Sequence, residues 1–175
     1  MRSGGFLNVK GRVVIDVGAY IGDMPIYFIM KGAREVLAYE PHPRLYAYLI
    51  RNIEVNNLRG VIKAYNLAVW SEDGEVGLDD SNYLMLAKTR EGGMLKVRSI
   101  KLPLMGDVLK MDCEGCEYDV LLSIDPAKLP FKEIGLEYHG SLKPIVRHLM
   151  RGGYKVNVVR GGRVGLIHAY RVNAS

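Results

Sequence analysis

The amino-acid sequence predicts an α/β fold: a doubly wound, mostly parallel sheet with an antiparallel hairpin at its C-terminal edge. β-branched runs and helical segments alternate along the chain, as they do where crossover helices join parallel strands. The last two apolar runs flank Gly161-Gly162, a turn that can only join antiparallel strands. A length of 175 residues fits one domain, 1–175.

The first part of the chain supplies the first strands and helices. Residues 11–18 are a β-branched run closed by glycine, which predicts a parallel strand buried on both faces. Asp23 can cap a helix over 23–31, and Pro25 is tolerated in its first turn. The next expected elements are a strand at 35–40, a helix at 43–56 and a strand at 61–70.

Residues 71–103 break this alternation. Polar turns separate short apolar pieces there, which predicts a β-hairpin insertion beside the core. The alternation then resumes up to the closing hairpin. The later expected elements are strands at 107–112 and 133–139, helices at 117–123 and from Ser141 to 152–153, and final strands at 154–160 and 163–171.

The composition, 49% hydrophobic and 25% charged residues, is that of an ordinary globular protein. No apolar stretch is long enough for a membrane span or a signal peptide, so we expect a cytoplasmic protein with no membrane partner. The net charge of +5 favours an anionic partner. Because Lys and Arg are scattered, a solvated basic surface explains this charge equally, and nucleic-acid binding stays an alternative.

The only cysteines, Cys113 and Cys116, form a single Cys-Glu-Gly-Cys. A zinc site would need a second pair or nearby histidines, which the sequence does not supply. A dithiol redox pair remains open.

Residues 16–22, Asp-Val-Gly-Ala-Tyr-Ile-Gly, lie between the first strand and the first helix, where glycines allow a tight turn and close approach to a ligand. Glu40 ends the second strand, where a carboxylate can accept both ribose hydroxyls of a nucleoside. The two features predict an adenosine-type cofactor. Asp16 would repel a pyrophosphate but suits an ammonium group, which favours S-adenosylmethionine over NAD.

Four motifs resemble the FkbM family of methyltransferases. They are Ile-Asp-Val-Gly-Ala-Tyr-Ile-Gly, Tyr-Glu-Pro-His-Pro, Asn-Leu-Ala-Val and Leu-Lys-Met-Asp-Cys-Glu-Gly-Cys-Glu, and the likeness extends over about residues 11–160. The last motif is the most specific, since the family pattern is Lys-x-Asp-x-Glu-Gly-x-Glu. The resemblance implies a Rossmann-like class I methyltransferase with a seven-stranded sheet that binds S-adenosylmethionine at the carboxyl ends of its first strands.

The resemblance also implies which residues bind the cofactor. The turn around Gly18 would hold the methionine part, Glu40 the ribose, and the residues after the second and third strands the adenine. The implied set is Asp16, Gly18, Ala19, Tyr20, Gly22, Glu40, Pro41, His42, Leu67, Ala68, Val69 and Asp112.

Four positions depart from the family pattern. Leu67 replaces a common acidic residue, so backbone groups are expected to recognise adenine, and Tyr20 replaces a common Asn. Cys113 and Cys116 replace small apolar residues, and we interpret them as core-sized fillers.

Methyl transfer to a hydroxyl benefits from a base near the methyl group. Asp112 and Glu114 follow the fourth predicted strand, and Glu137 and His139 end the fifth, so all four should meet beside the cofactor. We expect the catalytic residues among His139, Glu114 and Asp112, with His139 as the base because its pKa range suits this role. Glu117 is expected only to start the next helix.

A metal held by the same side chains is the alternative, although nothing in the spacing requires one. The function that we expect is O-methylation of a hydroxyl on a small molecule or sugar. An RNA (tRNA or rRNA) methyltransferase and a non-catalytic cofactor-binding module are the alternatives, and a homo-oligomer is compatible with either.

Overall fold

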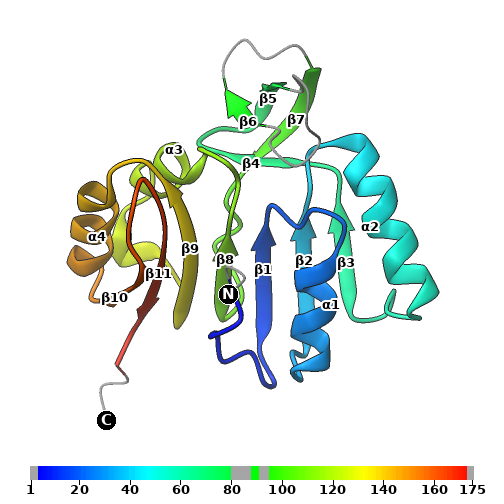
Figure 1. Cartoon of the computed structure of the whole chain (residues 1–175), viewed down its shortest axis with the longest axis horizontal. Coiled ribbons are helices and arrows are strands. Elements are labelled where there is room, and N and C mark those ends of the chain that lie inside the picture. The colour runs from blue at the N-terminus through cyan, green and yellow to red at the C-terminus, as the bar shows by residue number, and fades with distance from the viewer. Residues whose placement is uncertain (1–3, 80–87, 91–94, 173–175) are drawn as a thin grey trace.

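The computed structural model describes residues 4–79, 88–90 and 95–172. Strands and helices alternate along it much as the sequence predicts (Figure 1). The strands are β1 (Val13–Val17), β2 (Glu35–Tyr39), β3 (Ile62–Tyr65), β4 (Ala68–Trp70), β5 (Gly74–Asp79), β6 (Lys88–Arg90), β7 (Leu95–Lys101), β8 (Val108–Met111), β9 (Glu133–His139), β10 (Lys155–Arg160) and β11 (Val164–Tyr170). The helices are α1 (Asp23–Met30), α2 (Pro43–Val55), α3 (Glu117–Leu122) and α4 (Leu142–Arg151), with a 3-10 turn at Pro126–Lys128.

The main sheet has seven strands in the order β10-β11-β9-β8-β1-β2-β3. Strands β3, β2, β1, β8 and β9 pair in parallel, whereas β11 runs antiparallel to both β9 and β10. The predicted doubly wound sheet with its antiparallel C-terminal hairpin is therefore confirmed. Because β1 pairs with β2 on one side and β8 on the other, the topological switch point lies at the carboxyl end of β1.

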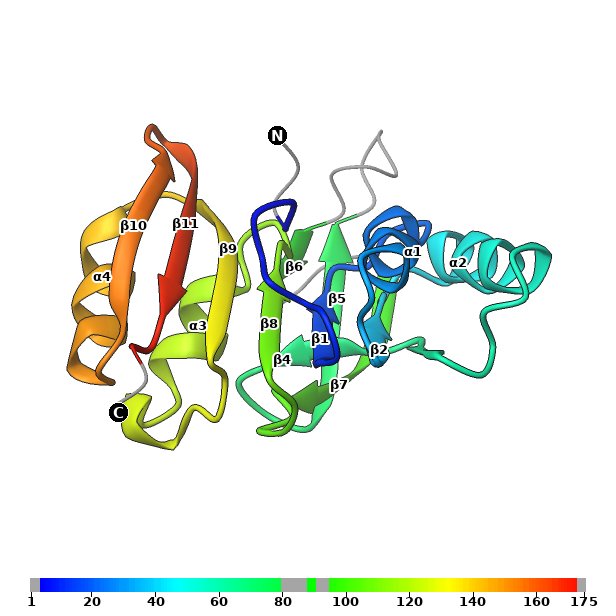
Figure 2. The same cartoon turned by 90° about the horizontal axis from the view of Figure 1, so that it is seen from below.

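Helices cover both faces of this sheet. Val14 of β1 belongs to the apolar cluster that contains side chains of α1 and α2. Its neighbours Ile15 and Val17 point to the opposite face, into the cluster formed with α3 and α4. Figure 2 shows the two helix pairs at opposite ends of the sheet.

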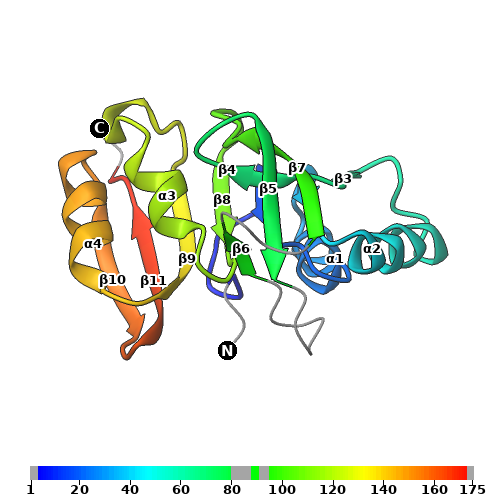
Figure 3. The same ribbon diagram turned by 90° about the horizontal axis from the view of Figure 1, so that it is seen from above.

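A second sheet, in the order β4-β7-β5-β6, lies above the carboxyl ends of the main strands (Figures 1 and 3). The predicted single strand over 61–70 is wrong, because β3 belongs to the main sheet and β4 to the second. Asn66 separates them, since its side-chain amide donates to the carbonyl oxygens of Glu40 and Pro41, both at 2.9 Å.

Strand β5 pairs antiparallel with both β6 and β7, which agrees with hairpins in the predicted insertion. Parts of that insertion, 80–87 and 91–94, lie outside the described residues. The extent of the single domain stays a prediction. No helix in the described part of the chain has both the length and the apolar character that a membrane span requires.

Candidate active site

The turn between β1 and α1 folds tightly against the loop that follows β8. Gly18 has φ +76°, and a Cβ on it would lie 1.8 Å from the carbonyl oxygen of Asp112. A side chain at position 18 would therefore clash with the main chain of Asp112. The N–H groups of Gly18 and Ala19 both donate to the Tyr39 carbonyl at 3.0 Å, which fixes the turn to β2.

A buried ion pair supports this turn from within the sheet. Asp16 and Lys110 are partners in the β1–β8 register, and Lys110 Nζ lies 3.0 Å from Asp16 Oδ1. The same ammonium donates to the Gly18 carbonyl at 2.7 Å. Burial raises the pKa of Asp16 to about 6 against the opposing effect of Lys110. Asp16 thus already has a cationic partner, and the pair fixes the carbonyl of the glycine turn.

Glu40 is 5% exposed at the carboxyl end of β2. Its two carboxylate oxygens accept the backbone N–H groups of Tyr20 and His42, at 2.9 and 2.8 Å. Burial raises its pKa to about 7, although these hydrogen bonds lower it. The carboxylate is therefore pre-oriented at the switch point and faces no cation at hydrogen-bonding distance within the described residues.

The residues expected around adenine lie next to Glu40. His42 is buried and caps α2, because its Nδ1 accepts the N–H of Arg44 at 3.2 Å. Ala68 and Val69 are buried in β4, which starts just after the Asn66 link to the end of β2. The structure thus brings the ends of β2 and β3 together, as the prediction requires.

The second group of predicted residues meets at the ends of β8 and β9. His139 Nε2 lies 3.2 Å from Glu114 Oε2 and 3.9 Å from Glu137 Oε1, and its Nδ1 lies 3.1 Å from Glu117 Oε1. The hydrogen bond to Glu117 raises the pKa of His139 above its ordinary value, against the effect of burial. Burial raises the pKa of Glu114. Glu137 also pairs with Arg160, at 2.8 Å.

These side chains form an imidazole held between carboxylates, which is a proton-accepting arrangement. One donor atom each from Asp112, Glu114 and His139 lie within 4.8 Å of one another. That spacing and the oxygen and nitrogen donors also suit a divalent cation, so the metal alternative has a geometric basis.

Glu117 does more than start α3. Its side chain is fully buried, and its Oε1 accepts the N–H groups of Cys113 and Gly115, at 3.3 and 3.2 Å, as well as contacting His139. Our prediction missed this contact because it needs strand β9 beside the loop. The signal was present in the family pattern, in which this glutamate is the last residue.

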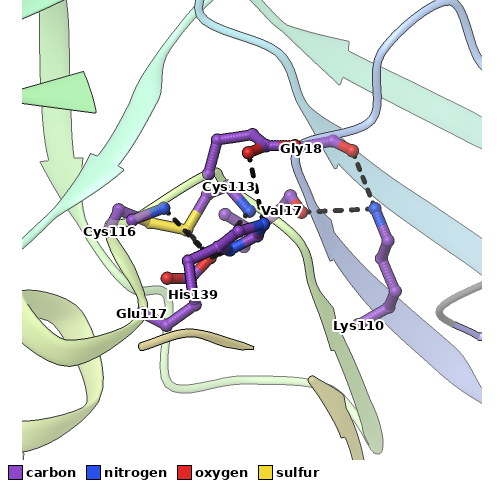
Figure 4. The surroundings of a disulfide bond; sticks show 9 residues. Val17, Gly18, Lys110, Cys113, Cys116, Glu117 and His139 are labelled. Atoms are coloured by element: carbon purple, nitrogen blue, oxygen red, sulfur yellow. Dashed lines mark hydrogen bonds and ion pairs between the residues drawn. A yellow bond between two sulfur atoms is a disulfide. The ribbon is translucent and has the colours of Figure 1, made fainter. Parts of the chain in front are cut away.

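Both cysteines pack in the core, as the interpretation as core-sized fillers predicts, because Cys116 is fully buried and Cys113 packs against the same cluster. They are in addition joined by a disulfide with a Cα–Cα distance of 5.5 Å, which is the pairing that the sequence left open. Figure 4 shows it close to Gly18 on one side and to Glu117 and His139 on the other. Lys110 was also missed as a functional residue, although a lysine within an otherwise apolar strand indicates a buried partner.

Comparison with known proteins shows the family of the chain and proteins that share its fold. The model of the methyltransferase FkbM domain matches residues 16–156. No curated protein sequence matches the chain. Three solved structures are similar to it in fold, at sequence identities of 13–16%.

The first is the FkbM methyltransferase of Methylobacillus flagellatus, with TM-score 0.65 and 16% identity over 95% of this chain and 45% of that one. The chain thus spans less than half of that protein. A candidate tRNA (m1A22) methyltransferase of Streptococcus pneumoniae has TM-score 0.61 and 13% identity over 99% and 70% of the two chains. A candidate RNA methyltransferase of Pyrococcus horikoshii has TM-score 0.56 and 15% identity over 95% and 76%. On the match to the family model, the chain belongs to the FkbM family of S-adenosylmethionine-dependent methyltransferases.

Proposed function

We propose that the protein transfers a methyl group from S-adenosylmethionine to a hydroxyl on a small molecule or sugar. One observation carries this proposal: His139, held by the buried carboxylate of Glu117, lies at the same edge of the sheet as the glycine turn. A base is useful for a hydroxyl acceptor, whose proton must leave as the oxygen attacks. A module that only binds the cofactor would not need such a base.

The residues at the switch point fit the cofactor. Glu40 offers a buried carboxylate, fixed by two backbone N–H groups, to the ribose hydroxyls. Pro41, His42 and the segment 67–69 would surround adenine, and the turn from Gly18 to Gly22 would take the methionine part. Asp16 would act through Lys110 by holding the Gly18 carbonyl. When bound, the cofactor supplies an electrophilic methyl group.

His139 would accept the acceptor's proton at Nε2. Glu117, whose Oε1 lies 3.1 Å from Nδ1, would favour the tautomer with the proton on Nδ1, so that Nε2 would be the acceptor. Glu114 and Asp112 would stabilise the imidazolium that forms and position the hydroxyl. Holding the acceptor hydroxyl close to the methyl group would supply the rest of the rate enhancement.

The test is a screen for transfer of a labelled methyl group to sugars, phenols and RNA. We expect transfer to a hydroxyl of a sugar or phenol, with a rate that changes little with added salt. No transfer to any acceptor, despite binding of S-adenosylmethionine, would indicate a binding module.

RNA is the second candidate, because the chain carries a net charge of +5. Methylation of RNA with a steep loss of binding at higher salt would favour it over the small acceptor.

A further inference from the structure

The disulfide between Cys113 and Cys116 closes the loop between β8 and α3. Glu114 lies inside this ring, with φ +55°, and Gly115 follows it with φ +121°. The N–H groups of Cys113 and Gly115 point to Oε1 of Glu117, the atom that also contacts His139. The ring therefore sets the main-chain path that supplies donors to this carboxylate.

Both nitrogens of the His139 ring depend on this loop. Nε2 faces Glu114, which is within the disulfide ring, at 3.2 Å. Nδ1 faces Glu117, which the ring's N–H groups hold, at 3.1 Å. Opening the ring would free the main chain between residues 113 and 116 and loosen both carboxylates at once, because no other covalent link closes this segment.

The two cysteines differ in exposure. Cys113 is half-buried, whereas Cys116 is fully buried in the core cluster of α3 and α4. Cys113 is the more exposed of the two, so an external thiolate would attack its sulfur and the sulfur of Cys116 would be the leaving group.

We propose that the Cys113–Cys116 disulfide is a reversible thiol–disulfide switch that positions His139 for methyl transfer. The proposal rests on the role of His139 as base given above. A thiolate of a dithiol reductant attacks Sγ of Cys113, the S–S bond breaks, and Cys116 leaves as a thiolate that takes a proton. The second thiol of the reductant then displaces Cys113. The protein gains two electrons and two protons, and the reductant becomes a disulfide.

In a reducing compartment, the disulfides that form are usually transient and redox-sensing, so a disulfide at this position could open and close there. The oxidised chain would hold His139 in position for proton transfer, and the reduced chain would hold it loosely.

The test follows His139 in the intact chain by nitrogen-15 nuclear magnetic resonance, so it needs no acceptor. The protein is titrated with acid after treatment with oxidised glutathione and, separately, with dithiothreitol. The groups that face His139 are Asp112, Glu114 and Glu117 from the β8–α3 segment and Glu137 from β9, itself paired with Arg160 of β10.

We expect reduction to lower the pKa of His139 toward its ordinary value, because Glu114 and Glu117 lose their fixed positions. Oxidised glutathione should reverse the change. The internal reference is His168, whose Nε2 lies 3.1 Å from Glu133 Oε2 near the amino edge of the sheet, and its nitrogen-15 signals at neutral pH should be the same in both states. The double variant Cys113→Ser with Cys116→Ser should match the reduced protein and ignore dithiothreitol.

Identical His139 titrations in the oxidised and reduced wild-type protein would overturn the proposal. Failure of oxidised glutathione to re-form the Cys113–Cys116 disulfide in the folded, reduced protein would also overturn it. Calorimetry with S-adenosylmethionine on the same samples tests the proposed function separately. Absent binding would remove the methyl-donor assignment, whereas a redox-dependent His139 pKa would still establish the switch.

Discussion

The two edges of the main sheet use glutamate in opposite ways. At the amino edge, Glu133 starts β9 and meets Arg12 at 2.7 Å, His168 at 3.1 Å and the N–H of Asn8 at 3.1 Å. Burial raises its pKa, but these hydrogen bonds outweigh burial and lower the pKa to about 2. At the carboxyl edge, burial dominates and raises the pKa of Glu40 to about 7.

The difference lies in the partners. The carboxylate at the amino edge has its charge balanced within the chain, so it stabilises the fold. Three glutamates lie at the carboxyl edge. Among the described residues, His139 lies between Glu114 and Glu117, whereas Glu40 accepts hydrogen bonds from backbone N–H groups. A buried carboxylate with a raised pKa and no cation marks a site prepared for a ligand or a proton. The predictions below test this contrast.

The largest expected effect is on Asp16, because its partner Lys110 is buried with it inside the sheet. Lys110→Met leaves Asp16 buried without its ammonium, and we expect a loss of about 3–5 kcal/mol in the free energy of unfolding. Chemical denaturation followed by circular dichroism measures it.

Lys132→Met is the matched control at the amino edge. It breaks the pair with Asp107, at 2.9 Å, whose lysine side chain is 58% exposed, so a loss of at most about 1 kcal/mol is expected. Equal losses in the two variants would contradict the contrast between the edges.

The second effect is on catalysis. His139→Ala should lower turnover about a hundredfold or more and leave cofactor affinity nearly intact, because most of the proposed cofactor contacts come from the ends of β1 to β4. In the wild type, the base must be unprotonated, so turnover should rise with pH through the raised pKa of His139. Steady-state rates with the acceptor from the screen measure both.

A variant with nearly wild-type turnover would eliminate His139 as the base. If Glu114→Gln then abolished transfer, the base would lie in the loop after β8.

The pH dependence of cofactor binding tests Glu40. Ribose hydroxyls donate to the ionised carboxylate, so binding of S-adenosylmethionine should tighten as pH rises toward 7, by up to about tenfold per unit, and level off above it. The same raised pKa makes ionisation of Glu40 cost stability as pH rises from 4.5 to about 7. Glu40→Gln should bind weakly with little pH dependence, and an unaltered profile in that variant would assign the titration to another group.

The smallest expected effect is that of metal removal. If His139 is the base, dialysis against EDTA should leave turnover unchanged. Loss of turnover with recovery on adding Mn²⁺ would instead assign the cluster of Asp112, Glu114 and His139 to a metal.

The sequence predicts the sheet well because local signals decide it. Each of these signals is contained in a short stretch of sequence, and the structure confirms the elements that they predict. They are the glycine turn, the β-branched runs and the Gly161-Gly162 hairpin. The partners of Glu117 and Lys110 could not be predicted in the same way. Both depend on which strands lie side by side, and the Asp16–Lys110 pair joins residues far apart in the chain.

The break after β3 illustrates the same limit. Residues 61–70 have the composition of one strand, yet Asn66 bonds to carbonyls at the end of β2 and redirects the chain into a second sheet. The sequence left the pairing of Cys113 with Cys116 open, because their spacing is equally compatible with separate packing.

Calorimetry with S-adenosylmethionine on the wild type, Glu40→Ala and Glu133→Ala tests most directly whether the carboxyl edge is the functional one. We predict binding by the wild type, affinity weaker by about 1–3 kcal/mol for Glu40→Ala, and unchanged affinity for a folded Glu133→Ala. NAD should not bind. Unchanged affinity in a folded Glu40→Ala variant, or binding of NAD in place of S-adenosylmethionine, would contradict the account.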